Sequence, residues 1–152
     1  DSLISRRALH ILAHWGEKVT AAAALDVLTY SDPWDAGFQE SLRILQQLGH
    51  KAVPAVRKFA KEQPDGPLPI IIADTLSRGR PSKRVTALLR ELFERSHWGE
   101  GREIIGAALA RMGNREDLAY LREKIAQEPA NRPDLMEELL HKLQEKEEEF
   151  HD

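Results

Sequence analysis

LGHKAVPAVRKFAKE, residues 48–62, holds the pattern that decides the fold. Its glycine, Gly49, ends one apolar-periodic run, ILQQLG at residues 44–49, and a second helical run begins within a few residues. Glycine is favoured just after a helix C-terminus, because a positive φ there costs it little. Pro54 lies in the first turn of the second run, where its missing N–H is tolerated. The stretch therefore predicts two helices joined by a tight turn.

The same arrangement occurs four times along the chain. Four glycines each end an apolar-periodic run, and they are separated by 33, 30 and 34 residues. The runs have a helical period, as in the stripe of Val85, Leu88, Leu89 and Leu92. Such a repeat is typical of helical arrays, in which neighbouring pairs bury each other's apolar faces. We expect a helix C-terminus with a positive φ at each glycine, namely Gly16, Gly49, Gly79 and Gly113.

We expect four antiparallel helix pairs followed by one capping helix. Asp134 is placed to cap the last helix, and a stripe of apolar residues can cover the open end of the array. That stripe comprises Met136, Leu139, Leu140 and Leu143. The predicted pairs are 2–14 with 17–30, 37–48 with 51–62, 68–77 with 82–95, and 102–112 with 116–127. They give units of about 2–30, 37–62, 68–95 and 102–127, followed by a capping helix at about 134–148. All of these belong to a single domain, 1–152.

Two of these stretches resemble a known repeat. LGHKAVPAVRKFAKE is similar to the HEAT-like repeat of the phycobilisome-lyase type, which runs helix, Leu-Gly, short turn, Ala-Val-Pro and apolar helix. LARMGNREDLAYLREKI, residues 109–125, is similar, with Asp117-Leu118-Ala119 where Ala-Val-Pro would stand. The third unit departs from the pattern, being shorter and having Arg80-Pro81-Ser82 in its turn. The resemblance covers about residues 2–127. It implies an all-α, right-handed α-solenoid of about four HEAT-like hairpins plus a C-terminal capping helix.

Composition limits the classes of protein that the chain can represent. It has no cysteine, which excludes disulfides and thiolate metal ligands and leads us to expect a cytoplasmic protein. No apolar stretch approaches the roughly 20 residues that a membrane-spanning helix needs, so we expect no membrane partner. The formal net charge is only −3, which indicates no single electrostatic partner.

The charge is distributed unevenly. Residues 134–152 hold eight acidic residues against two lysines, a net −6, so residues 1–133 carry +3. In HEAT-like arrays the second helix of each unit usually lines the concave surface, and here those of units two and three are basic. A basic strip on that face would bind a protein partner, particularly an acidic segment. Simple solvation of helix faces explains the same residues about equally well. The candidate binding residues are Arg57, Lys58, Lys61, Lys83, Arg84 and Arg90.

Other functions fit the sequence less well. The same strip could bind nucleic acid, but aromatic residues are few and the overall charge is negative. The resemblance also leaves open an enzyme such as a chromophore lyase, yet no catalytic constellation stands out. His10 and His14 have the i, i+4 spacing of a zinc pair but lack cysteine partners. We predict a non-catalytic protein–protein interaction scaffold with no cofactor and no metal site.

Two tryptophans occupy the same place in the repeat. Trp34 precedes Gly49 by 15 residues and Trp98 precedes Gly113 by 15, where one unit joins the next. We interpret them as packing between units. The alternative is that they are exposed aromatic anchors for a partner, because tryptophan is favoured at binding hot spots.

Overall fold

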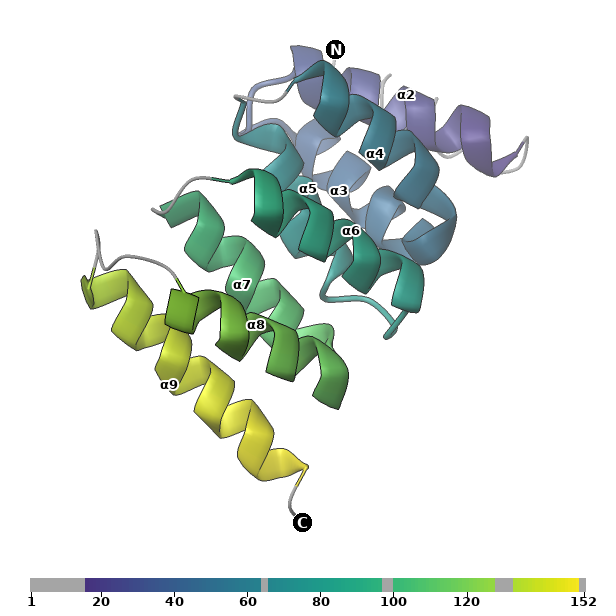
Figure 1. The fold of residues 1–152 in the computed structure, drawn as a ribbon. Coiled ribbons are helices and arrows are strands. Elements are labelled where there is room, and N and C mark those ends of the chain that lie inside the picture. Colours follow the sequence, from purple (N-terminus) through teal and green to yellow (C-terminus); the bar gives the residue numbers. More distant parts are fainter. Residues whose placement is uncertain (1–15, 64–65, 97–99, 128–132, 151–152) are drawn as a thin grey trace.

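The computed structural model describes residues 16–63, 66–96, 100–127 and 133–150, and this part of the chain contains helices and turns but no strand (Figure 1). The prediction of an all-α protein is confirmed. The predicted helix at 2–14 lies outside the described residues. The elements are α2 (Glu17–Tyr30), α3 (Ala36–Leu48), the 3₁₀ helix η1 (Gly49–Ala52), α4 (Val53–Glu62), α5 (Leu68–Leu76), α6 (Lys83–Arg95), α7 (Glu100–Met112), α8 (Arg115–Gln127) and α9 (Pro133–Glu149).

The helices form two rows. In one row α3 packs on α5, α5 on α7 and α7 on α9, and in the other α2 packs on α4 and α4 on α6. α8 packs on α7 and α9. Figure 1 shows α4, α6 and α8 as successive neighbours, with α3, α5 and α7 behind them. Because alternate helices share a row, α4 and α6 run side by side in the same direction.

One cluster of buried apolar side chains continues from α2 to α9. It includes the predicted stripe of α6, where Val85, Leu88, Leu89 and Leu92 are all buried. Burial of each such side chain contributes about 1.5–3 kcal/mol to folding. The periodic leucines of the sequence therefore hold the rows together.

α9 covers the end of the array by packing on both α7 and α8. Leu139 and Leu143 of the predicted apolar stripe are fully buried, and Leu140 is partly buried. The helix begins at Pro133, one residue before the predicted start, so Asp134 is its second residue. Proline suits the first turn because it has no N–H to leave unpaired.

The repeat glycines differ in conformation. Gly49 has a φ of 57° and Gly16 a φ of 139°, as predicted, but Gly79 and Gly113 have no positive φ, so that prediction is wrong for both. Steric crowding accounts for the glycine at position 113. A Cβ there would lie 2.6 Å from Cβ of Asp117, because the first turn of α8 folds back over this residue.

Candidate functional site

The six predicted binding residues lie on α4 and α6, but two of them already bind other helices. Arg57 forms an ion pair with Glu91 of α6, with 2.8 Å between Nε and Oε2. Arg90 forms one with Asp117 of α8, with 2.6 Å between Nη2 and Oδ1, and its guanidinium lies 4.4 Å from the ring centre of Tyr120. These two arginines therefore stabilise the contact between neighbouring helices.

Similar ion pairs join other neighbouring helices. Lys51 of η1 pairs with Glu17 of α2 at 2.8 Å, and Arg122 of α8 pairs with Glu147 of α9 at 2.8 Å. Exposed ion pairs each contribute about 0–1 kcal/mol, and partly buried ones contribute more because water screens them less. With the Arg57 and Arg90 pairs, they link α2 to η1, α4 to α6, α6 to α8, and α8 to α9.

The other four predicted residues are exposed. Among the residues that the structure describes, none of the four makes an ion pair or a side-chain hydrogen bond. All four charges are therefore accessible to a partner in this arrangement. They are Lys58 and Lys61 on α4, and Lys83 and Arg84 on α6.

These four cations form two pairs and do not make a continuous strip. The Arg57–Glu91 ion pair sets the register of α4 against α6. Lys58 follows Arg57 directly, whereas Arg84 precedes Glu91 by two turns, about 10 Å along the helix axis. One pair therefore lies toward the C-terminal end of α4 and the other at the first turn of α6.

Helix electrostatics distinguish the two pairs. Lys61 is in the last turn of α4, where a cation interacts favourably with the helix dipole. Lys83 and Arg84 are in the first turn of α6, where the dipole disfavours a cation by about 0.3–1 kcal/mol each. Ser82 already caps this helix by accepting a hydrogen bond from the Val85 N–H. The stability of α6 therefore does not account for Lys83 and Arg84.

A cleft of about 580 Å³ opens beside these two cations, between the turns of units two and three. Its charged and polar groups include His50, Lys51 and Arg80, and Ser82 lies directly before Lys83. The sequence marks the two turns by Gly49 and Gly79 but does not show that they face each other. The full lining comprises Gln46, Gln47, Leu48, Gly49, His50, Lys51, Gly79, Arg80, Pro81 and Ser82.

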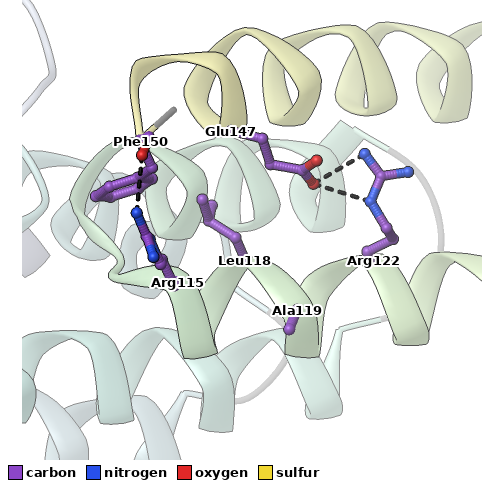
Figure 2. Close-up of a pocket in the computed structure, with 6 residues that line it drawn as sticks. All are labelled: Arg115, Leu118, Ala119, Arg122, Glu147 and Phe150. Carbon is purple, nitrogen blue, oxygen red and sulfur yellow. Dashed lines mark hydrogen bonds and ion pairs between the residues drawn. The ribbon is translucent and has the colours of Figure 1, made fainter. Parts of the chain in front are cut away.

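A second cavity, of about 350 Å³, lies between α8 and α9 (Figure 2). Figure 2 shows Leu118 between two polar contacts. Arg115 donates a hydrogen bond to the Phe150 carbonyl at 2.8 Å, and Arg122 pairs with Glu147. Both arginines of the cavity thus bind groups of this chain, and we assign the cavity to the junction between α8 and its capping helix.

The structure changes the interpretation of the tryptophans. Trp34 is 93% exposed, so the expectation that it packs between units is wrong. Trp98 lies outside the described residues. Position in the repeat did not indicate the exposure of Trp34, which lies in the turn between α2 and α3.

Across the described segments, no group of three or more His, Asp or Glu side chains is placed to hold a metal ion. No helix in the same segments is long and apolar enough to cross a bilayer. Comparison of the chain with protein-family models, curated proteins and solved structures found no match.

Proposed function

We propose that this protein is a right-handed, HEAT-like helical solenoid that acts as a non-catalytic scaffold and binds an acidic protein segment across α4 and α6. The observation that carries the proposal is the set of four exposed cations on this surface. Their neighbours Arg57 and Arg90 form ion pairs that fix α4 against α6 and α6 against α8. The helices that carry the cations are therefore held in place. A rigid surface loses less entropy when a partner binds.

The spacing of the cations suggests the form of the partner. The two pairs are offset by about 10 Å along the helices and by one helix spacing, about 8–10 Å, across them. An extended peptide rises about 3.3 Å per residue, so about four residues connect the pairs. We therefore expect two acidic groups separated by about four residues.

The turn cleft extends this surface beyond Lys83. His50 and Arg80 line it, and its volume of about 580 Å³ admits the side chain of a bound peptide. A carboxylate there would lie next to Ser82, which directly precedes the cations of the α6 first turn, and its negative charge would offset their unfavourable interaction with the helix dipole. Binding of an acidic partner therefore accounts for Lys83 and Arg84, whereas the stability of α6 does not.

An acidic peptide fits this surface better than nucleic acid does. Arg57 and Arg90 are paired with Glu91 and Asp117, and Glu62 of α4 is exposed, so the two helices offer separated cations rather than the continuous row that a run of phosphates requires. A peptide can instead place its carboxylates only where the cations lie. We therefore expect the partner to be an acidic peptide segment whose negative charges are separated.

A fluorescein-labelled peptide with two Glu-Glu pairs separated by four Gly/Ser residues tests this function by anisotropy. We expect Lys58→Glu and Arg84→Glu each to weaken binding at least fivefold, because each removes an attraction and adds a repulsion. Lys18→Glu, which changes an exposed cation of α2, is the matched control and should have little effect. Equal losses in all three variants would contradict the proposal.

A duplex DNA of generic sequence serves as the second ligand. We expect no binding above that of the Arg84→Glu variant at low salt. Binding that falls steeply with salt and is lost in Arg84→Glu would show instead that the surface binds nucleic acid.

A further inference from the structure

The turn between α2 and α3 presents two aromatic side chains to solvent. Tyr30, the last residue of α2, is 86% exposed, and Trp34 is 93% exposed. An indole in water contributes almost nothing to the stability of the fold, because stabilisation requires burial of its apolar surface. Tryptophan and tyrosine so placed are the residue types that dominate binding hot spots.

Hydrogen bonds hold this turn in one conformation. The Trp34 N–H donates to Oδ1 of Asp32 at 3.0 Å, and the Asp35 N–H donates to the Asp32 carbonyl at 2.9 Å. Nε2 of Gln39, in α3, donates to the Pro33 carbonyl at 3.4 Å. The indole is therefore carried on a closed turn anchored to α3, and little backbone entropy is lost when it binds.

The charge around the aromatic pair is negative. Asp26 lies one turn before Tyr30 on the same face of α2, and Asp32 and Asp35 flank Trp34. All three carboxylates are exposed, and in the described part of the chain no cation pairs with them. No Lys or Arg occurs between Lys18 and Arg43. A cation reaching this turn would meet three carboxylates and two aromatic faces.

We propose that this turn binds an arginine-bearing segment of a partner protein. We call it the α2–α3 aromatic surface, formed by Asp26, Tyr30, Asp32, Trp34 and Asp35. Guanidinium groups stack on indole faces, and tryptophan is the best aromatic partner for a cation. The carboxylates attract the same groups and orient them. The surface is opposite in charge to the α4–α6 cations and is separate from the proposed acidic-segment site.

The probe is a fluorescein-labelled peptide of alternating Arg and Gly with six arginines, with the same peptide carrying Glu in place of Arg as the negative control. We expect Trp34→Ala to weaken binding at least tenfold in anisotropy titrations. Trp34→Phe should lose less, because a smaller aromatic face remains. In NMR spectra, the indole N–H signal of Trp34 is identified by its absence in Trp34→Phe. This signal should shift when the peptide is titrated into the protein.

The carboxylates are tested with the variant Asp26→Asn/Asp32→Asn/Asp35→Asn. Asparagine preserves the turn at 32, because its side chain accepts the same backbone hydrogen bond. The matched control is Glu62→Gln/Glu137→Gln/Glu148→Gln, which removes three exposed charges elsewhere. We expect about a tenfold loss in the first variant and less than a twofold loss in the control.

Several results would overturn this proposal. Equal losses in the two triple variants would show that the peptide senses only net charge. Unchanged binding in Trp34→Ala, with the melting temperature also unchanged, would remove the aromatic contact. Self-association that requires both Trp34 and Arg84, measured by sedimentation velocity, would make a second copy the occupant. The first two results do not depend on whether the acidic peptide binds α4 and α6.

Discussion

Arg90 of α6 and Asp117 of α8 form an ion pair of 2.6 Å, and the same carboxylate also closes the first turn of α8. Oδ2 of Asp117 accepts from the Asn114 N–H at 3.0 Å, and Oδ1 of Asn114 accepts from the Asp117 N–H at 3.0 Å. This reciprocal capping satisfies two backbone donors that the helix start leaves free. Asp117 is buried, so one side chain sets both the start of α8 and its position against α6.

We predict that Asp117→Ala lowers the free energy of unfolding by about 2.5–4 kcal/mol. The variant loses a helix cap, worth about 1 kcal/mol, and a charge-assisted hydrogen bond, worth about 1.5–3 kcal/mol. Urea denaturation measures the change. Glu91→Ala removes the ion-pair partner of Arg57, a carboxylate that is more exposed than Asp117. It should lower the free energy of unfolding by less than about 1 kcal/mol. Equal costs in the two variants would contradict the central position that we assign to Asp117.

Charge reversal at the first turn of α6 should separate stability from binding. We predict that Lys83→Glu and Arg84→Glu each raise the free energy of unfolding by about 0.3–1 kcal/mol, because an anion suits a helix N-terminus. The same variants should bind the acidic peptide less tightly. Thermal unfolding at low salt measures the gain, and 1 M NaCl should reduce it. Destabilisation by both variants would argue that these cations serve the fold.

Gly106 permits α9 to approach α7 closely. A Cβ at this position would lie 2.9 Å from Cδ2 and 3.1 Å from Cδ1 of Leu139, which is fully buried. We predict that Gly106→Ala lowers the free energy of unfolding by about 1 kcal/mol. Overpacking costs about 1–3 kcal/mol and exceeds the gain in helix propensity of at most about 1 kcal/mol.

Gly101→Ala is the control for this prediction. Its methyl group would meet only the end of the Ile70 side chain, which is partly buried and able to turn away. We expect no loss of stability in chemical denaturation. A loss as large as that of Gly106→Ala would show that any methyl group on α7 is damaging, and would remove the special role of the α9 contact.

The Tyr120–Glu94 contact between α8 and α6 should make stability depend on pH. The Tyr120 hydroxyl donates to Oε1 of Glu94 at 2.5 Å, and this hydrogen bond, followed by that from Lys124, lowers the pKa of Glu94 below its ordinary value of 4.5. A carboxyl whose pKa is lowered by folding stabilises the fold above its unfolded pKa, and this contribution is lost as the pH falls through the folded pKa.

Tyr120→Phe removes the hydroxyl but keeps the ring against Phe93. We predict that the variant is about 0.5–1 kcal/mol less stable than the parent protein at pH 7. The difference should shrink below pH 4.5, where Glu94 takes up a proton. Burial and then the hydrogen bond to Glu94 raise the pKa of Tyr120, so the hydroxyl stays a donor throughout this range. A difference that stays constant from pH 7 to pH 3 would contradict the assignment.

Local sequence signals predicted the helices and much of the core. The Leu-Gly turn before Pro54, and the leucines of α6 and α9, indicated where helices end and which face they bury. Capping was predicted less well. The capping box between Asn114 and Asp117 was missed, although two capping residue types stand three apart there.

The sequence by itself determined an all-helical chain of repeated pairs, because helix period, turn glycines and apolar stripes act over a few residues. Only the tertiary structure decided which cations are accessible. Arg57 and Glu91 lie 34 residues apart, and their contact depends on how α4 and α6 pack. The same holds for Trp34, since its exposure follows from the path of a turn between two helices. Such features require the register and spacing of neighbouring helices, which no local pattern encodes.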